Sequence, residues 1–225
     1  MAETLRDSVL KLVAFFDCMG HLLLPEELAY FCRVSPNDVI FSSVISELIA
    51  EEKIAFFGNV YIGLLGRENL LIRTADAPRL WHKSLFLASR AARLLCFVPG
   101  VRALWVGNSV SFDAATEKSD IDVVIVVEKN KLWTARFFSH IVLRVFRMRT
   151  VKRAHAGRIC LSFFLTEEGF ADPLFQNEKD VYMRAWIGHL LPVYDPEKLL
   201  AVFRHSAGNI GVYFGSADAP PLYTV

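Results

Sequence analysis

Residues 104–127 read LWVGNSVSFDAATEKSDIDVVIVV and contain two apolar segments separated by a polar stretch. The second segment opens with Asp120, Ile121 and Asp122 and stays apolar to Val127. Side chains alternate between the two faces of a strand, so we expect both carboxylates on one face and Ile121 on the other. The apolar run that follows is typical of a strand buried on both faces.

The two carboxylates at the head of this strand carry like charges. Repulsion and lost hydration raise the free energy of such a pair unless a cation lies between them. A hard divalent ion such as Mg²⁺ is the usual partner. The alternative is that Ser119 to Asp122 form a polar loop end whose carboxylates face water.

A small polar turn, Gly107-Asn108-Ser109, follows the strand expected over residues 103–106 and precedes Asp120 by eleven to thirteen residues. This order of strand, turn, spacer and Asp-Ile-Asp strand resembles the nucleotidyltransferase superfamily, which includes DNA polymerase beta and the minimal and antibiotic nucleotidyltransferases. In that superfamily the turn is usually Gly-Ser or Gly-Gly and holds phosphate oxygens, while the paired aspartates hold metal. Asn108-Ser109 aligns with Gly-Ser, so the first glycine is either replaced by Asn108 or displaced to Gly107.

The resemblance covers about residues 78–167. It implies transfer of a nucleoside monophosphate from a nucleoside triphosphate to an acceptor, which can be a small molecule, a protein or a nucleic acid. It assigns Asp120 and Asp122 to catalysis and to Mg²⁺ (or Mn²⁺) binding. It assigns nucleotide binding to the turn formed by Gly107, Asn108 and Ser109, where glycine permits close backbone approach.

Active members generally add a third carboxylate from a later strand. Here the strand expected over residues 158–165 carries Ser162 and has no acid before Glu167 and Glu168. Either Glu167 or another acid such as Glu128 replaces the missing group, or the site binds metal and nucleotide without fast turnover. A catalytically degenerate binding or regulatory module therefore remains an alternative to the enzyme, and a winged-helix DNA-binding regulator is a third.

Composition and charge set the broad class. The 225 residues are 53% hydrophobic, which excludes disorder, and the formal net charge of +1 gives no global reason to expect a nucleic acid or an anionic membrane as partner. No apolar run is long enough to span a membrane, and the N-terminus is acidic where a signal peptide is basic. The four cysteines lack Cys-x-x-Cys spacing and are expected to be reduced. We expect a cytoplasmic protein with no membrane partner.

The expected fold class is α+β. The chain divides into a winged-helix-like domain (1–66), a nucleotidyltransferase-like core with a mixed β-sheet and flanking helices (77–170), and a C-terminal helical extension (171–225). A linker is expected over residues 66–76 and a long helix over residues 77–97.

The order of elements predicted for residues 1–66, three short helices and a β-hairpin, is that of a winged helix. The third helix, with Ser35 as its N-cap, is the one that would enter a DNA groove. It carries Asp38, Glu47 and two further acids but only Lys53 as a cation, at its end. DNA binding by this domain is therefore disfavoured, and a packing or protein-contact role is favoured.

Residues 129–158 contain nine lysines and arginines and no acid. They form either a solvated face or a surface that holds triphosphate or nucleic acid. Further along, a helix is expected from Glu178 to about Leu191, in which Trp186 is interpreted as a core residue and His189 as a packed or surface histidine.

Overall fold

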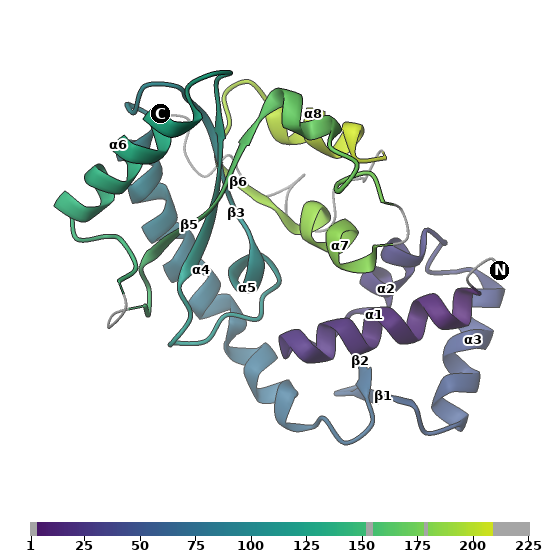
Figure 1. Ribbon diagram of the computed structural model, residues 1–225. Coiled ribbons are helices and arrows are strands. Elements are labelled where there is room, and N and C mark those ends of the chain that lie inside the picture. Colours follow the sequence, from purple (N-terminus) through teal and green to yellow (C-terminus); the bar gives the residue numbers. More distant parts are fainter. Residues whose placement is uncertain (1–3, 152–154, 178–179, 209–225) are drawn as a thin grey trace. The chain divides into compact units, whose positions relative to one another are not determined.

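The computed structural model describes residues 4–151, 155–177 and 180–208 (Figure 1). The chain divides into two compact units, Met1–Ala77 and Pro78–Val225. The first contains a two-stranded antiparallel sheet and the second a mixed four-stranded sheet, so the predicted α+β class is confirmed. None of the described helices has the length and apolarity that crossing a membrane requires.

The first unit has its elements in the predicted order. They are α1 (Leu5–Met19), α2 (Pro25–Cys32), α3 (Val39–Ala50), β1 (Ile54–Phe57) and β2 (Tyr61–Leu64). Helix α1 ends at Gly20, which takes a left-handed φ of 72° and closes the helix with backbone hydrogen bonds. The predicted N-cap of α3 is wrong, because Asp38 accepts hydrogen bonds from the first turn while Ser35 lies in the preceding turn.

Helix α4 (Asn69–Leu95) begins inside the stretch predicted to be a linker. The prediction of a linker over residues 66–76 is therefore wrong, and so is the helix start at residue 77. Pro78 lies inside the helix. A proline there removes one backbone hydrogen bond and favours a kink, and the turns on either side still form.

The second unit is built on the sheet order β5-β4-β3-β6. Its elements after α4 are β3 (Val101–Val106), α5 (Asn108–Ser111), β4 (Ile121–Val127), α6 (Leu132–Val145), β5 (Ile159–Thr166), the 3₁₀ helix η1 (Glu167–Ala171), α7 (Val181–His189), β6 (Leu191–Tyr194) and α8 (Leu199–Ser206). Strands β4 and β5 are parallel, and β3 is antiparallel to both of its neighbours.

Strand β6 was not predicted. The helix expected to run to Leu191 ends at His189, and Leu191–Tyr194 pairs with β3 at the edge of the sheet. Pro192 is compatible with this position because an edge strand has one side without ladder hydrogen bonds. The C-terminal part, predicted as a helical extension, thus contributes a strand to the central sheet.

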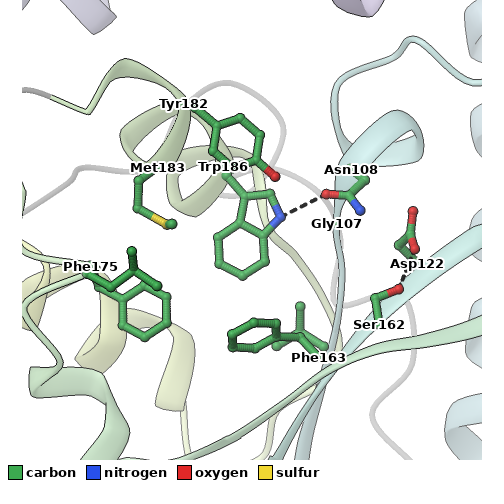
Figure 2. Close-up of a pocket in the computed structure, with 11 residues that line it drawn as sticks. Gly107, Asn108, Asp122, Ser162, Phe163, Phe175, Tyr182, Met183 and Trp186 are labelled. Carbon is green, nitrogen blue, oxygen red and sulfur yellow. Dashed lines mark hydrogen bonds between the residues drawn. The ribbon is translucent and has the colours of Figure 1, made fainter.

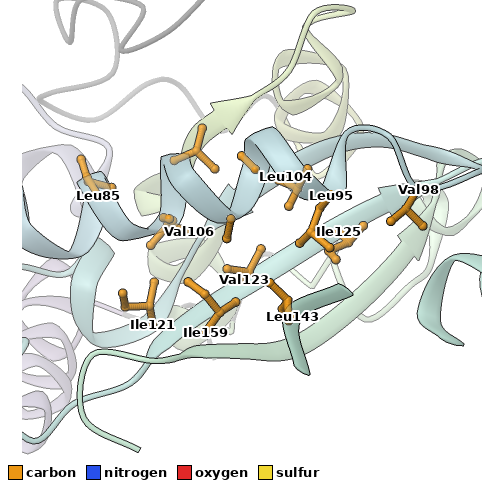
Figure 3. Packing of buried hydrophobic residues seen from close by; sticks show 14 of the residues in the cluster. Leu85, Leu95, Val98, Leu104, Val106, Ile121, Val123, Ile125, Leu143 and Ile159 are labelled. Atoms are coloured by element: carbon orange, nitrogen blue, oxygen red, sulfur yellow. The ribbon is translucent and has the colours of Figure 1, made fainter. Parts of the chain in front are cut away.

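Each face of the four-stranded sheet has its own cover. Helices α4 and α6 pack on the face that carries Leu104, Val106, Ile121 and Val123 (Figure 3). On the other face Trp105 stacks on Phe203 of α8, with ring centroids 5.7 Å apart. Because side chains alternate along β4, Asp122 lies on the face opposite to Ile121 and Val123.

Candidate functional site

The polar turn after β3 and the first residues of β4 lie together at one end of the two central strands of the sheet. Strand β3 ends where its antiparallel neighbour β4 begins, with Val106 opposite Val123. The backbone N–H of Gly107 donates to the carbonyl oxygen of Asp122 over 3.0 Å. The turn predicted to bind nucleotide is therefore joined directly to the strand that carries the acids.

Asp120, Asp122 and Cys160 form a cluster at this edge. Each offers one ligand atom, and these atoms lie within 4.8 Å of one another. Asp120 lies just before β4, where Ile121 donates its N–H to the carbonyl of Arg158 over 2.8 Å. Cys160 is opposite Asp122 in the parallel β4–β5 pair. The two aspartates converge as expected, and a thiol joins them.

Ser162 also reaches Asp122, through an irregularity in β5. The register shifts between Leu161 and Phe163, so Ser162 is an extra residue relative to β4. Its hydroxyl donates a short hydrogen bond to Oδ1 of Asp122. This contact orients the carboxylate and uses one of its lone pairs.

The expectation that Glu128 or Glu167 supplies the third carboxylate is wrong. Glu128 follows the last residue of β4, and Glu167 follows the last residue of the parallel strand β5. Asp120 and Asp122 lie at the start of β4, so roughly 20 Å of strand separates them from both glutamates, at about 3.3 Å per residue. Glu167 pairs with Arg102, and Glu128 pairs with Lys131 at 2.6 Å. Among the described residues, no carboxylate completes the cluster of Asp120 and Asp122.

Cys160 lies beside Asp122 on the neighbouring strand. Burial raises the pKa of its thiol, and the negative charges of Asp122 and Asp120 raise it further, although the hydrogen bond with Ser162 opposes these effects. The thiol is therefore neutral at neutral pH. A neutral thiol is neither a general base nor a good ligand for a hard cation.

A cavity of about 300 Å³ opens beside the acids. Figure 2 shows its polar side, formed by Asn108, Asp122 and Ser162, facing a group of aromatic side chains. The remaining lining residues are mostly apolar, and they are Gly107, Val124, Phe163, Leu174, Phe175, Tyr182, Met183 and Trp186. Such a lining suits a flat, largely apolar group with one polar end.

Trp186 connects helix α7 to the turn. Its Nε1–H donates to Oδ1 of Asn108 over 3.0 Å (Figure 2). A Cβ added to Gly107 would lie 3.3 Å from Nε1 of Trp186 and 3.2 Å from Cδ2 of Leu190. The lack of a side chain at Gly107 thus accommodates α7, whereas the sequence interpretation linked it to phosphate approach.

The sequence missed the contributions of Trp186 and Ser162 to this site. Trp186 is 7% exposed, as a core residue would be, but it also lines the cavity. His189 is packed, with Nδ1 2.9 Å from the carbonyl oxygen of Ala185. No local pattern links residue 186 to Asn108, because their contact depends on how α7 folds back on the sheet.

Two arginines of the basic segment 129–158 lie at the end of the sheet that carries the acids. Arg149 forms a bridge with Ile159, and Arg158 precedes β5 directly. The guanidinium of Arg158 donates to the carbonyl of Arg147 over 2.6 Å. Lys152 and Arg153, also part of this segment, lie outside the described residues.

Comparison with models of protein families, with curated proteins and with solved structures gives no match.

Proposed function

We propose that this protein is a metal-dependent nucleotidyltransferase that transfers a nucleoside monophosphate from a nucleoside triphosphate to an acceptor. The observation that carries the proposal is the junction of two features at one sheet edge. The Gly107–Ser109 turn bonds to the strand headed by Asp120 and Asp122, and the two carboxylates converge there. A pair of carboxylates that can hold a metal ion, beside a small polar turn, suits phosphoryl transfer.

The donor set fits Mg²⁺ or Mn²⁺ at Asp120 and Asp122. Two oxygens bound to one magnesium ion at about 2.1 Å lie at most about 4.2 Å apart. The ligand atoms here lie within 4.8 Å of one another, so a small side-chain rotation would bring both carboxylates to one ion. The neutral thiol of Cys160 does not suit this ion. When bound, the ion supplies charge neutralisation for phosphate oxygens.

The chain's own groups would position the triphosphate. Backbone N–H groups at Asn108 and Ser109, together with the Ser109 hydroxyl, would donate to phosphate oxygens. The Ser162 hydroxyl holds one oxygen of Asp122 and thereby fixes the carboxylate. The adjoining cavity accepts a flat group from the nucleotide or from the acceptor, whose identity stays open between small molecule, protein and nucleic acid.

Replacing either acid tests the proposal. We expect Asp120→Asn and Asp122→Asn to weaken Mg²⁺-dependent nucleoside triphosphate binding by at least tenfold, because each removes a charged metal ligand. Isothermal titration with each triphosphate, with Mg²⁺ or with chelator, measures this change. Glu128→Gln is the matched control, since this carboxylate lies at the other end of the same strand. Equal metal-dependent binding by wild type and both aspartate variants would refute the assigned site.

A second function is favoured by the lack of a third carboxylate among the described residues. In that case the site binds metal and nucleotide as a regulatory or binding module and does not turn over. The two functions differ in one product, because transfer releases pyrophosphate. Coupled pyrophosphate detection with a panel of hydroxyl acceptors separates them: release that Asp122→Asn abolishes supports the enzyme, and tight binding without release supports the module.

A further inference from the structure

Helix α6 has one side on the sheet and an outer side that is apolar. Ala135, Ser139 and Leu143 are buried on the inner side, where α6 joins the core beside α4 (Figure 1). The outer side exposes large apolar residues four positions apart, which we call the α6 stripe: Trp133, Phe137, Ile141 and Val145. Side chains four residues apart lie on one face of a helix, so the stripe is about 18 Å long.

The exposure of the α6 stripe is large for such residues. Trp133 is 77% exposed, Phe137 60% and Val145 70%. Tryptophan and phenylalanine are buried in most folded proteins, and a continuous apolar surface usually marks an interaction site. Phe138 and Phe146 are also exposed, which widens the apolar surface toward one side and the C-terminal end of the helix.

Positive charge surrounds the α6 stripe. Arg136, Arg144 and Arg147 are exposed on or directly after α6, and none of them forms an ion pair with a described residue. The segment 129–158 has nine cations and no acid, whereas the rest of the chain has 24 acids and 16 cations. The near-neutral total therefore conceals a basic segment. Within it Lys129 and Lys131 pair with Glu168 and Glu128, and the arginines of α6 keep their charge uncompensated by such pairs with described residues. The pKa of His140 agrees, since burial lowers it and the nearby arginines lower it further.

We propose that α6 lies on the surface of a membrane that contains anionic phospholipids. The α6 stripe would enter the boundary between headgroups and acyl chains, and Arg144 and Arg147 would contact lipid phosphates. A helix with tryptophan and phenylalanine on its apolar side and arginine beside them is the type that binds such interfaces. The expectation of no membrane partner was based on the net charge and on the lack of a spanning segment. The proposal goes beyond both grounds, because a helix lying on the surface needs no spanning segment and binds through its local charge.

The charge and shape of the α6 stripe disfavour other occupants. Two copies of the chain meeting through this helix would bring two basic regions together, and like charges repel. Single-stranded nucleic acid stacks its bases on aromatic rings, whereas Ile141 and Val145 form half of the stripe and offer no ring. Aliphatic and aromatic groups together match the acyl boundary of a bilayer.

Vesicle co-sedimentation of the full chain tests the proposal. We expect sedimentation with vesicles of phosphatidylcholine and phosphatidylserine, little with phosphatidylcholine alone, and weaker binding as salt increases. The double variant Trp133→Gln/Phe137→Gln should lose most binding. Arg144→Gln should weaken binding by on the order of fivefold, the effect of one arginine near an anionic surface. Both changes are at exposed positions, so the thermal unfolding midpoint should stay near that of wild type.

Two matched controls locate the effect. Phe97 is 82% exposed and lies outside α6, so Phe97→Gln should sediment as wild type does. Lys83→Gln removes an exposed cation from α4, outside the basic segment, and should leave binding unchanged. Trp133 emission should shift to shorter wavelength with anionic vesicles, and Trp133→Phe should abolish that shift.

Several outcomes would overturn the proposal. Wild type that stays in the supernatant with anionic vesicles refutes it, as does a Trp133→Gln/Phe137→Gln variant that binds as tightly as wild type. A wild-type dimer that the double variant converts to a monomer, without vesicle binding, assigns the stripe to a second copy. Salt-sensitive binding of single-stranded RNA without vesicle binding assigns it to nucleic acid.

Discussion

Asn108 adopts a left-handed backbone conformation, with φ 54°. Glycine takes this conformation at no steric cost and asparagine tolerates it better than most residues. The residue aligned with the first glycine of the Gly-Ser turn thus has a backbone that glycine would also accept. Gly107, by contrast, has a φ of −129°, which needs no glycine.

Two substitutions at Asn108 separate the backbone effect from the side-chain effect. Asn108→Gly and Asn108→Ala both remove the hydrogen-bond acceptor for Trp186. Residue 108 keeps a positive φ in both variants, and this conformation raises the free energy of the folded state for alanine but not for glycine. We expect Asn108→Ala to be less stable than Asn108→Gly by about 1 kcal/mol. Urea unfolding of both variants measures the difference. Equal stabilities would mean that the turn relaxes to a negative φ.

The raised pKa of Cys160 predicts slow alkylation. A thiol reacts as the thiolate, and burial and the adjacent carboxylates favour the protonated form. The midpoint of the pH–rate profile for iodoacetamide should therefore lie above the ordinary thiol value of 9.0. Asp120→Asn removes one of the negative charges and should lower that midpoint. Peptide-level mass spectrometry follows Cys160 separately from the other thiols, and a midpoint unchanged by Asp120→Asn would contradict the charge effect.

The packing of helix α7 requires a residue without a side chain at position 107, in the turn after β3. A Cβ at Gly107 would come 3.2–3.3 Å from Leu190 and Trp186, closer than most packed contacts. We expect Gly107→Ala to destabilise the protein by about 1 kcal/mol through this overpacking, and to weaken the Trp186–Asn108 hydrogen bond. Denaturant unfolding measures the cost.

The smaller ring in Trp186→Phe provides the control for this contact. In that background Gly107→Ala should cost less, because the indole Nε1 is gone, and the difference between the two costs is the coupling energy. Equal costs in both backgrounds would show that Leu190 alone opposes the added methyl group.

Local sequence patterns predicted most elements of the fold, and non-local pairing decided the rest. Helix α1 and strand β4 follow from apolar periodicity that is visible within one segment. Strand β6 has four residues and a proline, and it exists because it pairs with β3, roughly ninety residues earlier. The first turns of α4 precede Pro78, and a proline in the sequence favours a helix start at its own position over one nine residues earlier.

In the candidate site, too, some features follow from local sequence patterns and others depend on non-local strand pairing. The convergence of Asp120 and Asp122 follows from the period of a strand, and their junction with the turn follows from two strands that are close in sequence. The neighbours of Asp122 on β5 depend on parallel register, so Cys160 and the bulged Ser162 could not be placed in advance. Parallel register also places Glu167 at the far edge.

At the scale of the whole molecule, charge is unevenly distributed between the two units. Helix α3, the element that would enter a groove, carries Glu47 and is capped by Glu51. The carboxylate of Glu51 pairs with Arg6 of α1 at 2.6 Å and with Lys53 at 3.0 Å. Val39 and Ile40 are the exposed apolar residues at its start. A helix with this surface lacks the cations that phosphate contacts require.

The last prediction concerns duplex DNA. Because α3 contributes no unpaired cation, we expect the full chain to show no DNA binding that depends on the first unit. Any weak, salt-sensitive binding should arise from the basic segment 129–158 and should fall in Arg144→Gln, since each phosphate contact adds a salt-dependent increment. Fluorescence anisotropy with a labelled duplex across a salt series measures both. Lys53→Gln is the comparison in the first unit and should leave the signal unchanged. Binding that Lys53→Gln reduces and Arg144→Gln does not would restore the winged-helix regulator, because the contacts would then lie on the first unit.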